Sequence, residues 1–284
     1  MSKTLYDLSG KIDPSTIDAL AQIDRVAAGL NLGFFIVGAT ARDILMEHVH
    51  NIRAPRMTKD IDIAVCVADW GEYKALTEGL VATGRFARRA QQRRYDFEAA
   101  SIDIIPFGDI SGRENRISWP PDHETVMSTA GLRDTYDYAI TCRLSRSPAI
   151  DVKVVSIPGL AILKLLAWNE GYPEREKDAQ DLLFLLRSYQ RAGIEDRLYD
   201  QETDMLIEEG FDNERAGIRL LGRDLAGMMH PGTAEAIKAI LDRETGENSD
   251  FRLVNQMSRN IDNAEIMMSY LEKLKQGFNE GRGL

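Results

Sequence analysis

Strand-forming patterns in this sequence occur in its first half, which limits the chain to a sheet domain followed by helices. Residues 34–37 form a short apolar run, and residues 61–67 alternate Ile and Val with Asp, Ala and Cys, as in a strand with one buried face. Further strands are predicted over 86–99 and 101–107, and helices over 14–30, 39–49 and 70–83. This alternation of strands and helices predicts an α+β or α/β sheet domain over residues 1–150.

The second half of the sequence carries helical spacing of apolar residues. Its clearest predicted helices are 157–168 and 177–189, and turn residues separate them at 171–173. We therefore predict an all-helical C-terminal domain over residues 151–284. The last residues, Gly277–Leu284, are polar and rich in glycine, and we expect them to be frayed.

The balance of charge is acidic, with 35 Lys and Arg residues against 45 Asp and Glu and a net charge of −10. Such a chain is a poor general binder of phosphate backbones, because that affinity is largely electrostatic. No apolar run approaches the roughly 18 to 20 residues of a membrane span, and the first residues do not resemble a secretion signal. Cys66 and Cys142 are far apart and typical of reduced core residues. We expect a cytoplasmic protein that does not contact a membrane.

Three aspartates on the predicted strands are candidate metal ligands. Asp60 and Asp62 are two residues apart and so point from the same face of a strand, and Asp103 is the single acid in another apolar strand. Carboxylates held close together repel each other unless one is protonated or a cation joins them. Hard oxygen ligands of this kind suit Mg²⁺, which also takes substrate phosphates. The alternative is a pair of acids at the exposed end of a strand.

A small-residue turn, Gly38-Ala39-Thr40, lies 22 residues before this acid pair, where a strand is predicted to pass into a helix. Gly38 permits close backbone approach, and the start of the helix offers free N–H groups to a phosphate. Thr40 adds a hydroxyl donor. Metal ligands beside a phosphate cradle predict transfer of a nucleotidyl group, with Asp103 or Asp62 as the base. The sequence does not separate these two.

At these residues the chain resembles the DNA polymerase β-like nucleotidyltransferases. Residues 103–108 (DIIPFG), 157–168 (IPGLAILKLLAW) and 177–182 (KDAQDL) are similar to the AbiEii/AbiGii toxin branch, and the resemblance covers roughly residues 30 to 225. It implies a mixed sheet flanked by helices, a helical C-terminal domain and an NTP in the cleft between them. It further implies the toxin of a type IV toxin–antitoxin pair, with a cognate antitoxin and, for some relatives, tRNA as the acceptor.

Lys164 is the only charged residue in the stretch 157–168, so its ammonium requires an anion or a route to water. The resemblance implies that Lys164 holds the triphosphate and that Asp178 also belongs to the nucleotide site; a lysine extended to the surface is the alternative. Asp178 and Asp181 are three residues apart and share one helix face. Either one pairs with Lys164 or reaches the active site, or both are solvated.

The run Gly38–Asp43 also resembles the corresponding run of CCA-adding enzymes and poly(A) polymerases. Arg42 and Asp43 therefore either touch the nucleotide or RNA, or pair with each other at the helix surface. The block from Lys164 to Asp181 argues against a true CCA-adding enzyme.

Five arginines fall within ten residues just before the strand of Asp103. Four of them, Arg88, Arg89, Arg93 and Arg94, are candidate contacts for tRNA. The alternative is a solvated basic hairpin edge that prevents strand pairing.

Two other functions compete with an RNA-modifying enzyme. One is a nucleotidyltransferase that acts on small molecules, and the other is a catalytically silent nucleotide-binding regulatory module. The intact set of three acids argues against the silent module. Trp70, Trp119 and Trp168 are expected to pack in the core rather than to stack on bases. The identity of the NTP and the acceptor does not follow from the sequence.

Overall fold

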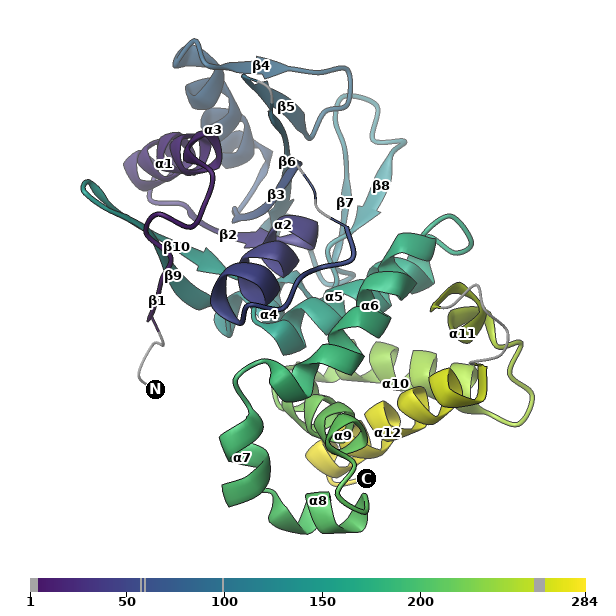
Figure 1. Cartoon of the computed structure of the whole chain (residues 1–284). Helices are drawn as coiled ribbons and strands as arrows, with labels where there is room; N and C mark the ends of the chain where they lie inside the picture. Colours follow the sequence, from purple (N-terminus) through teal and green to yellow (C-terminus); the bar gives the residue numbers. More distant parts are fainter. Residues whose placement is uncertain (1–4, 57, 59, 99, 258–263) are drawn as a thin grey trace. The chain divides into compact units, whose positions relative to one another are not determined.

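The computed structural model describes residues 5–56, 58, 60–98, 100–257 and 264–284, and the chain divides into two compact units (Figure 1). The first unit is Met1–Ser156 and the second is Ile157–Leu284. The predicted order, a sheet domain followed by helices, is confirmed. The division lies a few residues beyond the predicted boundary at residue 150, because strand β10 (Ala149–Val154) still belongs to the sheet.

The first unit is built on an eight-stranded mixed sheet with the strand order β1-β9-β10-β2-β3-β6-β5-β4. Besides β10, its strands are β1 (Leu5–Asp7), β2 (Gly33–Val37), β3 (Ile61–Cys66), β4 (Phe86–Arg88), β5 (Arg94–Phe97), β6 (Ala100–Phe107) and β9 (Ile140–Arg146). Strand β3 runs parallel to β6 and antiparallel to β2. A separate two-stranded sheet pairs β7 (Arg116–Ser118) with β8 (Val126–Ser128).

The helices of the first unit lie where the sequence predicts them, except for the short helix Leu132–Asp137, which was not predicted. They are α1 (Pro14–Gly29), α2 (Gly38–Asp43), α3 (Trp70–Ala82) and α4 (Leu132–Asp137), and a short 3-10 turn spans Asp109–Ser111. Asp13 begins α1 by accepting hydrogen bonds from the backbone N–H groups of Ser15 and Thr16. Helix α2 continues into a π-helical segment, Ile44–Val49, so the predicted helix over 39–49 is present with a wider second half.

Strand alternation separates the two faces of the sheet at β3 and β6. Asp62 and Asp103 share one face, and the fully buried Ile63 and Ile104 beside them point to the other. Tyr136 of α4 packs its ring on the face of the aspartates, at 5.3 Å and 5.4 Å from the ring centroids of two core phenylalanines, Phe35 and Phe107. The aspartates therefore lie on the sheet face that also carries the aromatic cluster of Phe35, Phe107 and Tyr136.

Two parts of the sheet differ from the prediction. The single strand expected over 86–99 is a hairpin of β4 and β5 at the edge of the sheet, and Ala99 lies outside the described residues. Strands β1, β9 and β10 were not predicted. The antiparallel pairing of β9 with β10, with a register shift between Ile150 and Asp151, and the parallel pairing of β1 with β9 extend the sheet beyond β2.

The second unit is helical, as predicted. Its helices are α5 (Ile157–Glu170), α6 (Glu176–Ser188), α7 (Glu195–Asp200), α8 (Thr203–Glu208), α9 (Asn213–Ala226), α10 (Pro231–Thr245), α11 (Arg252–Met257) and α12 (Ala264–Arg282), with a 3-10 turn at Tyr189–Arg191. In the described part of the chain, the helices lack the length and apolar character needed to cross a membrane.

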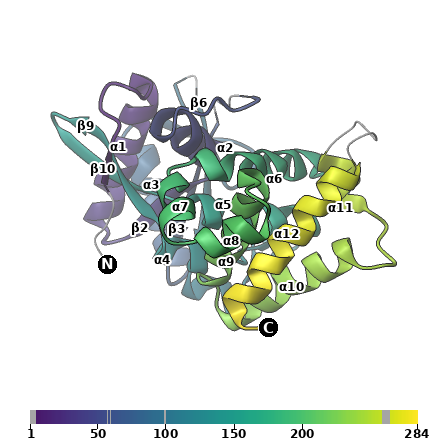
Figure 2. The ribbon, with the colours of Figure 1, turned by 60° about the horizontal axis from the view of Figure 1, so that its bottom comes forward.

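Helices α9 and α12 lie side by side in the second unit (Figure 2). A Cβ atom at Gly277 of α12 would collide with the backbone of Arg219, and one at Gly222 of α9 would collide with the backbone of Leu274. Glycine at both positions permits this close approach of the two helix backbones. The expectation of a frayed tail from Gly277 is wrong, because the helix continues to Arg282.

Candidate active site

The turn from β2 to α2 brings a glycine against one of the predicted acids. Val37, the last residue of β2, pairs with Asp62 of β3. Gly38 follows with a φ of +65°, and a Cβ atom on it would collide with the Asp62 carboxylate. Both the backbone conformation and the contact therefore require glycine at this position.

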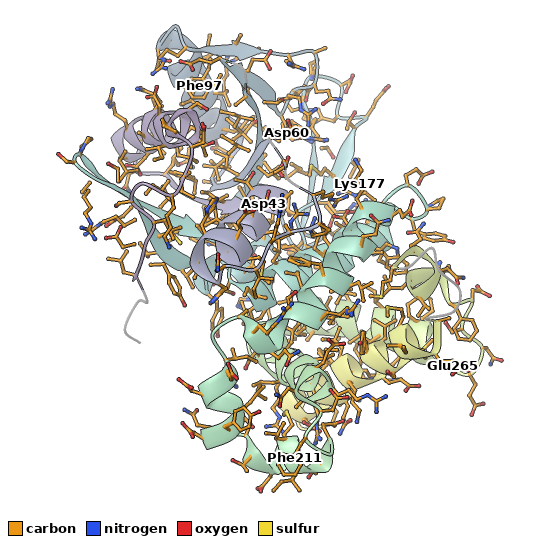
Figure 3. The ribbon with its side chains drawn as sticks, viewed as in Figure 1. Asp43, Asp60, Phe97, Lys177, Phe211 and Glu265 are labelled. Atoms are coloured by element: carbon orange, nitrogen blue, oxygen red, sulfur yellow. The ribbon has the colours of Figure 1, made fainter. Side chains whose placement is uncertain are left out.

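Asp62 and Asp103 lie directly opposite each other on the parallel strands β3 and β6. Asp60 lies one residue before β3 and is exposed to solvent (Figure 3). Within the described residues, no group of three or more His, Cys, Asp and Glu side chains is arranged to hold a metal ion. The strand register thus brings two of the three predicted acids together, and the complete set of three ligands stays a prediction.

Asp103 is held by a neighbouring arginine. Arg94 of β5 lies opposite Asp103 in the strand register and donates two hydrogen bonds to it, from Nε to Oδ1 at 2.7 Å and from Nη2 to Oδ2 at 2.9 Å. Arg93 approaches Oδ2 with its Nε at 3.5 Å. The hydrogen bond with Asp103 raises the pKa of Arg94, and the nearby charges of Asp60 and Asp62 raise it further. Asp103 is thus a buried carboxylate in a bidentate ion pair.

Thr40 fixes the backbone at Asp60. Its hydroxyl donates a hydrogen bond of 2.5 Å to the Asp60 carbonyl, and the Asp60 N–H donates to the hydroxyl of Thr58 at 3.1 Å. Thr40 is buried, and its single hydroxyl proton is used in this bond. In this structure Thr40 therefore orients the segment that leads into β3.

Arg42 and Asp43 pair with each other, which was one of the two alternatives drawn from the sequence. Arg42 Nε and Nη2 lie 2.9 Å and 2.6 Å from Asp43 Oδ1, and Nη2 also donates to the carbonyl of Arg56 at 2.6 Å. Arg42 is fully buried, so the pair lies in the interior rather than at the helix surface. This burial does not support a direct contact between Arg42 and a nucleotide.

Lys164 lies in the second unit, where it forms a buried ion-pair cluster. Its Nζ lies 2.7 Å from Asp178 Oδ1 and 2.7 Å from Asp181 Oδ2, and Arg175 Nε lies 3.1 Å from Asp178 Oδ2. Both aspartates come from one face of α6, as their spacing predicts. Two cations and two anions make the cluster neutral, so the ammonium of Lys164 has its anions within its own unit.

The remaining arginines of the candidate RNA contact lie on the edge hairpin. Arg89 pairs with Asp96 of β5 at 2.6 Å, and this hydrogen bond raises the pKa of Arg89. Arg88 is exposed and forms no ion pair with the described residues. Strand β4 forms one edge of the sheet. The basic hairpin edge expected as an alternative is therefore present, and it does not exclude a binding role for the same arginines.

Comparison with known families identifies the chain. Residues 19–273 match the family described as nucleotidyl transferase AbiEii toxin, type IV TA system. The chain belongs to this family. It is accordingly a nucleotidyltransferase of the AbiEii toxin family, and the resemblance seen in the sequence is confirmed.

Three solved structures that resemble this chain at low sequence identity are the following. An antigenic nucleotidyltransferase-like protein from Paracoccidioides brasiliensis is 14% identical with a TM-score of 0.42, over 74% of this chain and 94% of that chain. The antibiotic-resistance factor ANT(2'')-Ia is 15% identical with a TM-score of 0.38, over 70% and 98%. A Thermotoga maritima CCA-adding enzyme complexed with tRNA is 11% identical with a TM-score of 0.26, over 96% and 83%. No curated protein matches significantly.

Sequence reasoning missed the role of Arg94 beside the acid. Arg94 was predicted only as one of four RNA contacts, because the segment 86–99 was expected to be a single strand. The segment 89–93 contains no Gly, Pro, Asn, Asp or Ser, so no sequence signal shows that β5 folds back to pair with β6. Once β5 pairs with β6, Arg94 and Asp103 necessarily share a face.

Proposed function

We propose that this AbiEii-family protein transfers a nucleotide from an NTP to an acceptor RNA, with Mg²⁺ held by Asp60, Asp62 and Asp103. The observation that carries the proposal is the cross-strand pair of Asp62 and Asp103 with Gly38 packed against Asp62. Two carboxylates that lie side by side on neighbouring strands can supply oxygen ligands to one cation, and the absence of a side chain at Gly38 leaves Asp62 uncovered on that side.

The donor set fits magnesium. All the predicted ligands are carboxylate oxygens, which Mg²⁺ prefers, and the open side of Asp62 is kept clear by Gly38. When bound, Mg²⁺ neutralises the triphosphate and stabilises the leaving pyrophosphate. Asp62 and Asp103 orient the reacting groups, and Thr40 keeps Asp60 in place through its backbone carbonyl.

The backbone at Gly38 and Ala39 is the proposed contact for the phosphates. Helix α2 begins at Gly38, so its first N–H groups are not used within the helix. They lie beside Asp62, where a bound triphosphate would meet the metal. In this proposal Thr40 contributes by positioning Asp60, and Arg42 with Asp43 supports the turn from inside.

RNA is the acceptor that the charges favour. The hairpin of β4 and β5 carries Arg88, Arg89, Arg93 and Arg94 in a chain with a net charge of −10. A localised basic element in an acidic protein attracts an anionic partner at that element alone. We further propose that the acceptor is tRNA and that the protein acts in the cytoplasm. The description of its family suggests that it is a toxin neutralised by a cognate antitoxin.

Label transfer tests this function. Purified protein with Mg²⁺ is incubated with each of the four α-labelled NTPs and with total tRNA, whole-cell protein or small-molecule acceptors. Label in tRNA that is lost in Asp62→Asn and retained in Asp109→Asn, an exposed carboxylate near the sheet, supports the proposal. Label in a small molecule alone would assign the other enzyme class, and no label with any acceptor would favour a silent nucleotide-binding module.

A further inference from the structure

A cavity of about 500 Å³ lies between α3, the hairpin of β4 and β5, and the residues that follow β7. Its aromatic wall is formed by Trp70, Tyr73 and Trp119, and its rim carries Lys74, Arg88 and Arg89. We call it the aromatic pocket. All these residues belong to the first unit, and the volume is within the usual range for small-ligand sites.

The aromatic wall is a cluster of three rings in tilted or edge-to-face contact with one another. The ring of Trp70 lies 5.6 Å from Tyr73 and 5.2 Å from Trp119, and Tyr73 lies 5.6 Å from Trp119. Tyr73 and Trp119 are almost fully buried, whereas Trp70 is only half-buried. The two inner rings therefore support Trp70, which keeps part of its surface available to a ligand.

The charge of the pocket selects an anion. Three of the lining residues are Lys or Arg, and none is Asp or Glu, although acids outnumber bases in the whole chain by 45 to 35. Arg88 forms no ion pair with the described residues, and Lys74 approaches its helix neighbour Glu78 only at 3.8 Å. A polycationic small molecule would be repelled here, whereas a planar group attached to a phosphate would find both a ring and a counter-charge.

A second cavity adjoins the aromatic pocket. It has a volume of about 260 Å³, shares Ala90, Gln92 and Trp119 with the aromatic pocket and is also lined by Arg93. Arg93 is the residue whose Nε lies 3.5 Å from Asp103 Oδ2. Arg93 therefore lines the second cavity and also approaches the acid of β6.

We propose that the aromatic pocket binds an unpaired nucleobase of the acceptor RNA, stacked on Trp70, with the adjoining phosphate held by Arg88 and Arg89. Single-stranded nucleic acid is commonly bound in this way, by aromatic rings along a basic groove. The inference rests on the proposed function, because it supplies the acceptor side of that reaction. It also revises the expectation that Trp70 serves only for packing, whereas Trp119 is buried as expected.

Binding of a short RNA tests the pocket without catalysis. A single-stranded RNA hexamer of mixed sequence is titrated into the protein in the absence of NTP and Mg²⁺, and affinity is measured by fluorescence anisotropy over a range of salt concentrations. We expect Trp70→Ala to weaken binding about ten-fold, which is the usual loss when one stacking aromatic is removed, and Trp70→Phe to retain most of the affinity. The same hexamer in a duplex should bind more weakly, because its bases are already stacked.

Charge-reversal variants test the proposed contact between Arg88 and a phosphate of the RNA. Arg88→Glu should weaken binding and reduce its dependence on salt, whereas Arg25→Glu, an exposed arginine of α1 outside the pocket, should change neither. Thermal unfolding of each variant identifies any loss that comes from misfolding. Wild-type affinity in both Trp70→Ala and Arg88→Glu, or no binding of the hexamer to the wild-type protein, would overturn the inference.

The two proposals fail in different ways. If the hexamer binds and the pocket variants weaken it, but no label is transferred to any RNA, the proposed reaction is wrong and the pocket stands. If label is transferred to RNA while the pocket variants bind and react like the wild-type protein, the acceptor is held elsewhere and the pocket inference is wrong.

Discussion

Two buried charges, one in each unit, are both neutralised by ion pairs, but their partners differ in exposure. Asp103 in the first unit pairs with Arg94, whose side chain is 29% exposed. Lys164 in the second unit pairs with Asp178 and Asp181, whose side chains are 10% and 1% exposed. The first pair therefore has one member at the solvent boundary, whereas all three charges of the second lie in the interior.

From this difference we predict a site that can open around Asp103 and a cluster that supports the fold around Lys164. If Arg94 leaves Asp103, the guanidinium returns to water at little cost, and the carboxylate becomes available to a cation. If Lys164 leaves its partners, two carboxylates remain buried, with Arg175 near Asp178 alone. The acid of β6 is thus the better placed of the two to exchange its protein partner for a ligand.

The largest expected effect is on catalysis, at the aspartates of β3 and β6. Asp62→Asn and Asp103→Asn should each lower nucleotidyl transfer by at least about 10³-fold, because the charge stabilisation supplied by a metal is several kcal/mol and each 1.4 kcal/mol is ten-fold in rate. Thermal unfolding should change little, because Arg94 is near solvent. Transfer at the wild-type rate in both variants would remove these acids from the reaction.

The next largest effect is expected on the stability of the second unit, at the buried ion pairs of Lys164. Lys164→Met should lower the free energy of unfolding by about 3 to 5 kcal/mol, because it leaves two buried carboxylates without their ammonium. The matched control is Lys238→Met, which breaks an exposed pair with Asp242 and should cost no more than about 1 kcal/mol. Urea denaturation of both variants measures the difference.

A second variant makes this prediction sharper. Lys164→Met/Asp181→Asn leaves Asp178 paired with Arg175, and it should recover much of the lost stability. Equal stability of Lys164→Met and Lys238→Met would contradict the contrast between the two units. That result would mean that Lys164 does not stabilise the fold, and it would favour a role for Lys164 in binding a ligand.

A smaller effect is expected on metal binding. Arg94→Gln should raise the affinity for Mg²⁺ a few-fold, because the guanidinium no longer competes for the oxygens of Asp103. Titration calorimetry without NTP measures this directly. The matched control is Arg143→Gln, since Arg143 holds Asp151 with nearly the same geometry, at 2.8 Å and 2.9 Å, on strands away from the acids. A lower affinity in Arg94→Gln would mean that Arg94 orients Asp103 for the metal.

The central strands and their acids could be predicted because their signals are local. Alternating apolar residues identify β3, and a single acid in an apolar run identifies Asp103 in β6. Parallel neighbouring strands then place Asp62 beside Asp103. Gly38 was likewise predictable, because a glycine between a strand and a helix indicates close backbone approach.

The missing parts depend on partners that lie far away in the sequence. Arg94 contacts Asp103 only because the β4–β5 hairpin places β5 beside β6 in one particular register. The sequence of residues 86–97 does not reveal where the hairpin turns, and so it does not reveal that register. Gly277 looked like part of a frayed tail because its close contact with the backbone of Arg219 is not visible from its neighbours. The aromatic pocket combines α3, the hairpin and Trp119, so no single segment indicates it.

The smallest effect concerns the exposed pair that serves as the control. Hydrogen bonds from Lys238 and then Lys275 lower the pKa of Asp242 below its ordinary value of 3.8. A carboxyl group with a lowered pKa in the folded state stabilises the fold above its ordinary pKa, and this contribution is lost as the pH falls through the folded value. Asp242→Asn should therefore be slightly less stable than the wild-type protein at pH 7, by less than about 1 kcal/mol. The gap should close below about pH 3.8 and narrow with added salt. A gap that persists in acid would show that Asp242 acts through packing, and Lys238→Met would then no longer be a fair measure of an exposed ion pair.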